Sequence, residues 1–234
     1  MSRVEFRGNC AILWLGSAEN KFTTESVYRI KSQISEILRH NQVKVLITAS
    51  SGKFYSNGID LDWLGQQQAE TSESFFNNLI DLIVMILTLP VFTIAAINGH
   101  AFAAGAILAL AHDFRVMQKG RGWISLPEVF LGLNFTPGLQ EMMKSKIGSP
   151  SCLRDAILLG KRFTAEEALD KQLVDRACEP GCAVETSVQL GEEIVNGRDY
   201  GREIIKSLKE DLYANSLRLF REYNLSRSVA VSKL

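Results

Sequence analysis

Two short runs of residues are apolar at nearly every position, and they constrain the fold of this 234-residue chain more than any other feature. The runs are VKVLITA (43–49) and FTIAAI (92–97). A strand with one face in water alternates apolar and polar residues, so a continuous apolar run indicates a strand that is buried on both faces. Such strands need helices on both sides of their sheet, which predicts an α/β architecture.

The rest of the first half of the chain alternates between strand-like and helix-like patterns. Short β-prone runs occur at 4–8, 10–15, 114–117 and 123–126. The turn-like Gly8-Asn9 separates the first two runs, which predicts a hairpin. Apolar residues recur at helical spacing from Val27 to Leu38, and a second helix is expected to end before Pro90 because proline breaks helices.

After about residue 148 the strand signals fade and helical signals dominate. Ser149-Pro150 is typical of a helix start, and Thr164 with Glu167 forms a capping-box pattern. A stripe of apolar residues follows Tyr200, at Ile204, Leu208, Leu212, Leu219 and Phe220. The stripe predicts a terminal helix that packs on its own core or on another subunit.

The composition excludes several classes of protein. Lys+Arg and Asp+Glu are equal at 26 each, so no basic field exists to attract nucleic acid or an anionic membrane. Asp81 and Pro90 interrupt the apolar segment 79–97, which argues against a membrane span. The four scattered cysteines match neither a zinc site nor a disulfide framework, so we expect reduced thiols and no metal.

Three stretches carry the candidate chemistry, namely SGKFYSNGIDL (51–61), NGHAFAAGAILALAHD (98–113) and SLPEVFLGLNF (125–135). The first two are turns rich in small residues that follow strands, where backbone N–H groups can point at an anion and form an oxyanion hole. A simple packing role for the small residues is the alternative. In the third stretch, Glu128 lies among apolar neighbours that would raise its pKa, although a first-turn helix residue beside the macrodipole fits the same position.

Taken in order, these three stretches resemble the crotonase, or enoyl-CoA hydratase/isomerase, superfamily, from the first strand to about Asp175. The resemblance implies a crotonase-like spiral of ββα units over residues 1–175. It also implies a C-terminal helical region, residues 176–234, that assembles subunits into a homotrimer or hexamer. The substrate would be an acyl-CoA thioester, with no metal or redox cofactor.

The resemblance also implies roles for individual residues. The backbone N–H groups of Ile59 and Ala104 would form the oxyanion hole for the thioester carbonyl, and Glu128 would move the proton. The neighbouring residues expected to bind substrate are Ser56, Asn57, Gly58, Asp60, Leu61 and Gly105.

Ile107 distinguishes this chain from the family's hydratases, which carry a glutamate at the matching position to activate water. An alkyl side chain cannot do this, so we expect a Δ3,Δ2-enoyl-CoA isomerase that uses Glu128 alone. Certain family isomerases carry their base at the position that matches Thr136, which is no base near neutral pH. The alternatives are another reaction of the same family (weak hydration, decarboxylation or thioester cleavage) or a non-catalytic acyl-CoA-binding subunit.

The sequence ends in Ser232-Lys233-Leu234, a tripeptide that the peroxisomal import receptor recognises. We therefore expect the protein in the peroxisomal matrix, where oxidation of unsaturated fatty acids produces 3-enoyl-CoA intermediates.

Overall fold

The computed structural model describes residues 3–231, and the side chains as far as Tyr223. The predicted targeting tripeptide, Ser232 to Leu234, lies outside the described residues. No helix of the described part is long and apolar enough to cross a membrane.

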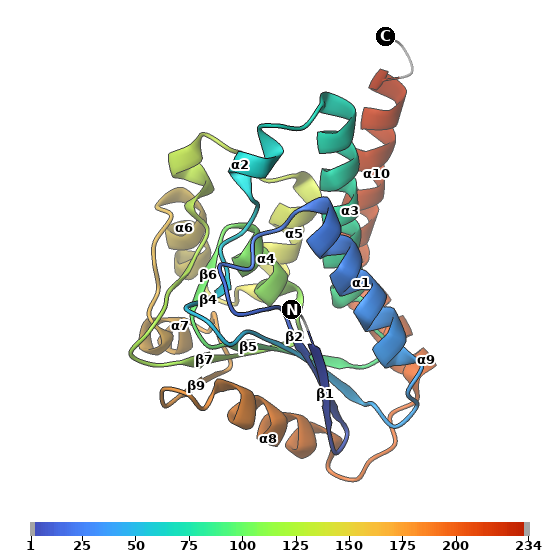
Figure 1. Cartoon of the computed structure of the whole chain (residues 1–234), viewed down its shortest axis with the longest axis vertical. Helices are drawn as coiled ribbons and strands as arrows, with labels where there is room; N and C mark the ends of the chain where they lie inside the picture. The colour runs from blue at the N-terminus through green and yellow to red at the C-terminus, as the bar shows by residue number, and fades with distance from the viewer. Residues whose placement is uncertain (1–2, 232–234) are drawn as a thin grey trace.

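The secondary structure alternates between strands and helices up to β9 and is helical after it (Figure 1). In chain order the elements are β1 (Arg3–Arg7), β2 (Cys10–Trp14), α1 (Thr24–Leu38), β3 (Val45–Ala49), β4 (Phe54–Ser56), α2 (Leu61–Leu64), α3 (Ala69–Leu87), β5 (Phe92–Ile97), β6 (His100–Phe102), α4 (Ala104–Ala111), β7 (Phe114–Gln118), β8 (Ile124–Ser125), the 3-10 helix η1 (Pro127–Leu131), α5 (Pro137–Lys146), α6 (Pro150–Leu158), α7 (Ala165–Asp170), β9 (Arg176–Cys178), α8 (Ala183–Val195), α9 (Arg202–Leu212) and α10 (Ala214–Val231).

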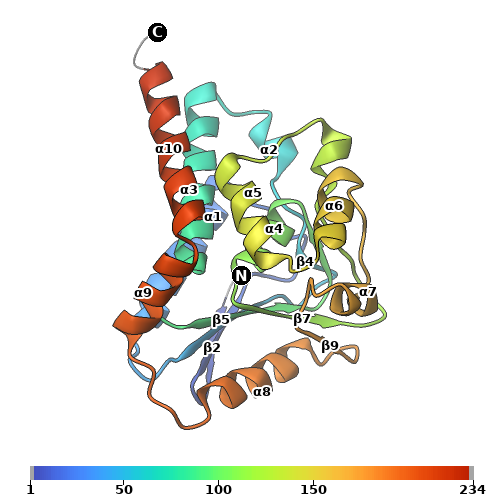
Figure 2. The same ribbon diagram turned by 180° about the vertical axis from the view of Figure 1, so that it is seen from behind.

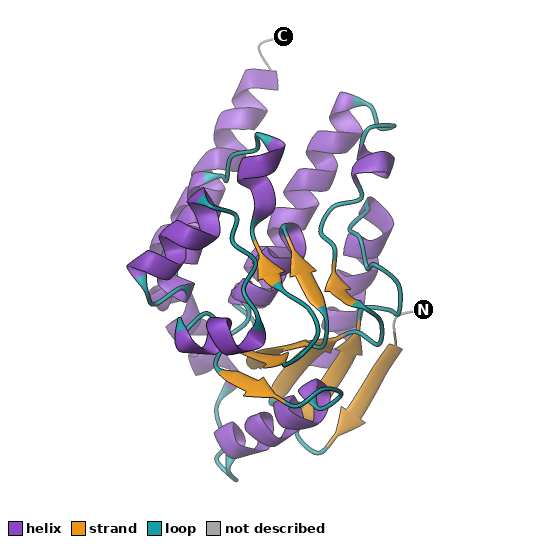
Figure 3. Ribbon diagram, turned by 90° about the vertical axis from the view of Figure 1, so that its left-hand side faces the viewer, coloured by secondary structure: helices purple, strands orange, loops and turns teal. Residues whose placement is uncertain are grey.

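The strands form a six-stranded sheet, in the order β1-β2-β3-β5-β7-β9, and a three-stranded sheet, β4-β6-β8. Strands β1 and β2 form the predicted antiparallel hairpin, and every other pairing is parallel. Figure 3 shows the smaller sheet standing above the larger one. The strands β4, β6 and β8 therefore carry the chain from the large sheet to the loops that precede α2, α4 and η1.

The central strands β3 and β5 of the six-stranded sheet are buried on both faces, as the continuous apolar runs predict. Alternate residues such as Ile47 and Ile94 point into a core beneath the sheet, which α8 covers (Figures 1 and 2). Their neighbours, such as Leu46 and Ala95, point into the larger core that the remaining helices surround. The α/β prediction is confirmed.

Two features of the C-terminal part differ from the sequence prediction. Strand β9 was missed because it is only three residues long, and it extends the sheet just beyond the predicted boundary at residue 175. The expected terminal stripe is divided between two helices, because α9 ends at Leu212 and α10 begins at Ala214, after Tyr213.

The α9 residues of the predicted stripe lie on the outer side of the helix, whereas Ile205 of the same helix is buried. Ile204, Leu208 and Leu212 are 55%, 58% and 70% exposed, whereas Phe220 of α10 is buried. The stripe therefore does not pack on the core of its own chain along its whole length. Assembly of a trimer or hexamer through this region stays a prediction.

A buried ion pair holds α9 against the sheet. Lys209 Nζ lies 2.5 Å from Asp113 Oδ2 and also donates to the Val91 carbonyl at 2.8 Å. The same Asp113 oxygen accepts a hydrogen bond from the Thr93 N–H at 2.8 Å. Because both charged side chains are almost entirely removed from water, each depends on the other for compensation.

Replacing Lys209 with alanine should therefore lower the free energy of unfolding by about 3–5 kcal/mol, because Asp113 would remain buried without its cation. Urea denaturation monitored by circular dichroism measures this change. Lys206→Ala is the control, because its pair with Glu210 is exposed and should contribute less than about 1 kcal/mol. Equal destabilisation by the two substitutions would contradict the assigned role of the buried pair.

Candidate active site

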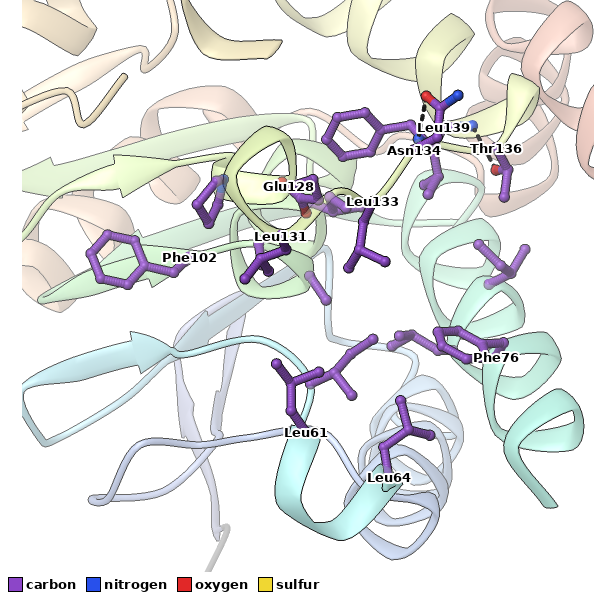
Figure 4. A pocket seen from close by; sticks show the side chains of 18 of the residues that line it. Leu61, Leu64, Phe76, Phe102, Glu128, Leu131, Leu133, Asn134, Thr136 and Leu139 are labelled. Carbon is purple, nitrogen blue, oxygen red and sulfur yellow. Dashed lines mark hydrogen bonds between the residues drawn. The ribbon is translucent and has the colours of Figure 1, made fainter. Parts of the chain in front are cut away.

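A cavity of about 730 Å³ lies between α2, α3, the start of α4, η1 and the start of α5. Its walls are mainly apolar, and Figure 4 shows leucine and phenylalanine side chains from several of these elements facing it. The apolar side chains that line it include Leu61, Leu64, Phe76, Leu79, Ile80, Phe102, Leu131, Leu133, Phe135 and Leu139. Such a space fits an extended hydrocarbon chain.

The first predicted oxyanion donor, Ile59, lies on the loop between β4 and α2 and lines the cavity. The neighbouring backbone groups of this loop are paired with Phe22: its N–H donates to the Gly58 carbonyl at 2.8 Å, and its carbonyl accepts from Asp60 N–H at 3.1 Å. The Ile59 N–H itself donates to no described residue. It is therefore available to a ligand.

The second predicted donor, Ala104, is the first residue of α4, where helix geometry leaves N–H groups without intrahelical acceptors. The preceding Ala103 has φ 49° and ψ −125°, a conformation that side chains rarely adopt. A hydrogen bond of 3.0 Å from Ala103 N–H to the Ser125 carbonyl supports this turn. The Ala104 N–H likewise donates to no described residue.

The two donors are neighbours because glycine lets their loops approach closely. A Cβ atom on Gly58, whose φ is +79°, would lie 3.3 Å from the Ala104 nitrogen. A Cβ atom on Gly105 would lie 2.5 Å from the Ser56 carbonyl oxygen, so α4 could not pack on β4 with any larger residue there. Two free N–H groups beside the positive end of a helix favour an oxygen that carries negative charge.

Glu128 lies on η1 and is 7% exposed, although it lines the same cavity as the two donors. Its Oε2 atom is buried without a hydrogen-bond partner among the described residues. Desolvation raises the pKa of Glu128 from its ordinary value of 4.5 to about 7. The only other carboxylate lining this cavity in the described part, Asp62, is exposed on α2.

Backbone and side-chain hydrogen bonds hold the η1 turn and the strand that precedes it. The Ser125 hydroxyl donates to the Gly160 carbonyl at 3.1 Å, and Ile124 pairs with Phe163 in a short antiparallel bridge. Leu133 N–H then donates to the Glu128 carbonyl at 3.0 Å. These contacts hold the carboxylate where the three-stranded sheet ends.

The remaining predicted binding residues divide into two groups. Asn57 and Leu61 line the cavity itself. Ser56, Gly58, Asp60 and Gly105 do not line it but shape the donor loops. The Ser56 hydroxyl accepts from Gly58 N–H at 3.2 Å, and the Asp60 carboxylate caps α2 through Trp63 N–H at 3.2 Å.

Ile107 and Thr136 also line the cavity. Ile107 is 6% exposed and adds a branched alkyl group to the wall. Thr136 accepts a hydrogen bond from Leu139 N–H at 3.4 Å as the N-cap of α5. Neither residue provides a second proton acceptor beside Glu128.

Several cavity residues were not found from the sequence. The apolar residues of α3, Phe76, Leu79 and Ile80, have the same spacing as core residues, so their pattern does not separate a cavity wall from a core. Lys21 lines the cavity and pairs with Glu19 at 3.0 Å, but one lysine in a loop has no sequence signature. Tyr223 comes from α10, far from the motifs in the chain.

Comparison with known proteins agrees with this geometry. The family model described as enoyl-CoA hydratase/isomerase matches residues 17–228. This chain belongs to that family. The predicted superfamily is confirmed.

Curated relatives cover nearly the whole chain. Enoyl-CoA delta isomerase 2, peroxisomal, from Arabidopsis thaliana is 34% identical over 91% of this chain and 92% of its own. Enoyl-CoA delta isomerase 1, peroxisomal, from the same plant is 34% identical over 99% of this chain and 98% of the relative's length. Their names agree with the expectation that the protein is an enzyme of the isomerase class.

Among solved structures, a probable enoyl-CoA hydratase, EchA3, from Mycobacterium tuberculosis superposes with a TM-score of 0.87 at 21% identity, over 99% of this chain and 96% of that one. At this identity the likeness concerns the fold alone. It confirms the predicted crotonase-like fold.

The raised pKa of Glu128 predicts a pH-dependent difference in stability between the wild type and Glu128→Gln. Above pH 4.5, Glu128 of the unfolded chain loses its proton, whereas Glu128 of the folded chain keeps it until about pH 7. The free energy of unfolding of the wild type therefore falls between pH 4.5 and about pH 7, and this loss remains at higher pH. The variant has no such group, so its stability relative to the wild type should rise across this window by up to roughly 3 kcal/mol. Urea denaturation at a series of pH values measures the difference; parallel curves would show that Glu128 ionises normally.

Proposed function

We propose that the protein is a Δ3,Δ2-enoyl-CoA isomerase, which converts 3-cis- or 3-trans-enoyl-CoA to 2-trans-enoyl-CoA. The observation that carries the proposal is one buried carboxylate, with an Oε2 atom that has no hydrogen-bond partner among the described residues, in the same apolar cavity as two backbone N–H groups that donate to no described residue. The names of the curated relatives support the same activity.

In the proposed reaction the thioester oxygen accepts hydrogen bonds from Ile59 and Ala104. Ionised Glu128 removes a proton from C2, and the electrons of the broken C2–H bond form the C2=C3 double bond through an enolate whose oxygen the two N–H groups stabilise. The electrons of the former C3=C4 bond then take the proton back from Glu128 at C4. The substrate and product are isomers, and the carboxylate is regenerated.

The raised pKa of Glu128 suits this shuttle. A carboxylate with an ordinary pKa is a weak base toward a carbon acid, whereas a pKa of about 7 makes it a stronger base and still leaves about half of it ionised at neutral pH. The apolar walls that raise the pKa also exclude water from the enolate.

Ile107 favours isomerisation over hydration. Hydration needs a water molecule to be held and activated beside the double bond, and Ile107 offers no hydrogen-bond acceptor at that place. A water molecule activated by Glu128 alone would give the weaker hydratase reaction that remains the rival on this scaffold. Mass spectrometry of the product separates the two, because hydration adds the mass of one water.

Glu128→Gln should lower the isomerase rate by about 10²–10⁴-fold, because glutamine keeps the shape of the side chain but cannot accept the proton. The rate of the wild type should rise with pH through about 7 as Glu128 ionises. Formation of the conjugated thioester from 3-cis-enoyl-CoA, followed by absorbance, measures both effects. Glu70→Gln, an exposed substitution of the same kind, is the control; a wild-type rate for Glu128→Gln would exclude the proposed base.

We also propose that the protein acts in peroxisomes. Two of the relatives cited above carry this location in their names, and the sequence contains Ser232-Lys233-Leu234. A fluorescent protein fused to the N-terminus of this chain should accumulate in peroxisomes. The same fusion without these three residues should stay in the cytosol, and unchanged import would show that another segment carries the signal.

A further inference from the structure

Helix α10 packs along α5 in an antiparallel register that two contacts define. At one end, Lys146 Nζ lies 2.6 Å from the Tyr213 hydroxyl. At the other end, Phe220 covers Gly138, in the first turn of α5. Because the two helices run in opposite directions, residues of α10 after Phe220 continue past the N-terminus of α5.

The contact at Gly138 brings the two helices unusually close. A Cβ atom added to Gly138 would lie 2.4 Å from the Phe220 ring. Phe220 and Leu217 are 4% and 6% exposed, so this face of α10 is closely packed. The register of α10 is therefore determined in part by the fit of the Phe220 ring against the backbone of Gly138.

Tyr223 follows Phe220 by three residues and lies on the same side of α10. It reaches the space just beyond the N-terminus of α5, where Phe135, Thr136 and Leu139 line the cavity, and Tyr223 lines the cavity with them. The C-terminal helix thus contributes a wall to a site whose other residues all precede α6.

This wall lies on the side of the cavity away from η1. Glu128 belongs to η1, which packs on α6. Figures 1 and 2 show α6 and α10 on opposite sides of α5. A substrate whose thioester is held at Ile59 and Ala104 would extend its acyl chain past Leu139 toward α10.

We propose that Tyr223 is the residue that limits the length of the acyl chain. The inference rests on the proposed function, since it assumes that the thioester carbonyl lies at the two free N–H groups. Tyr223 lines the apolar cavity from α10, and the packing of Phe220 on Gly138 holds this helix in register. Acyl chains that reach the ring gain contacts with the walls, and longer chains must displace α10.

The test measures the binding of saturated acyl-CoA thioesters, from butanoyl-CoA to hexadecanoyl-CoA, to the full chain by calorimetry. In the wild type, affinity should rise by roughly fourfold for each buried methylene and then stop rising at a limiting length. Tyr223→Ala should move this limit to longer chains, and Tyr223→Trp should move it to shorter ones. Tyr223→Phe, which keeps the ring, should leave the limit unchanged.

Tyr28→Ala is the matched control, because Tyr28 is 74% exposed on α1 and does not line the cavity. Should Tyr223→Ala fail to fold, Tyr223→Leu provides the smaller side chain. The same limiting length in the wild type, the smaller variants and Tyr223→Trp would overturn the proposal.

Saturated thioesters cannot isomerise, so this measurement does not depend on turnover. A shifted limit in a protein that converts no 3-enoyl-CoA would support the role of Tyr223 and reject the isomerase. Isomerase activity together with an unchanged limiting length would support the isomerase and reject the role of Tyr223.

Discussion

The site depends on the close approach of two backbone segments, the loop after β4 and the first turn of α4. Their approach is possible because Gly58 and Gly105 have no side chain at the contact, and within the described part of the chain the N–H groups of Ile59 and Ala104 have no acceptors. Unpaired backbone donors in an apolar space are costly, so the surrounding hydrogen bonds must hold them there. Ser125 supports the turn at Ala103, and Phe22 pairs with the residues on both sides of Ile59.

The electrostatics of Glu128 follow from the same architecture. The three-stranded sheet ends beside the cavity, so that η1 inserts a carboxylate among side chains that cannot hydrogen bond to it. The burial that raises its pKa is the burial that makes it a stronger base. Ile107 adds an alkyl group to the cavity wall and supplies no second carboxylate beside Glu128.

The C-terminal helices join the site to the rest of the chain. The ion pair of Lys209 with Asp113 and the packing of Phe220 on Gly138 fix α9 and α10 against elements that precede them by more than a third of the chain length. Residues that stabilise the fold therefore also position a wall of the cavity.

The sequence alone was enough to identify the α/β fold and the hairpin, because these depend on local patterns of apolar runs and a glycine turn. The resemblance to the crotonase superfamily selected Glu128, Ile59 and Ala104, and all three line one cavity, while their roles in the reaction stay a prediction. The sequence could not separate cavity residues such as Phe76 and Leu79 from core residues, since both follow the same helical spacing. The division of the terminal stripe at Tyr213, the strand β9 and the place of Tyr223 in the cavity were decided only by tertiary structure. Each depends on contacts between segments far apart in the chain, and periodicity within one segment carries no information about its distant partners.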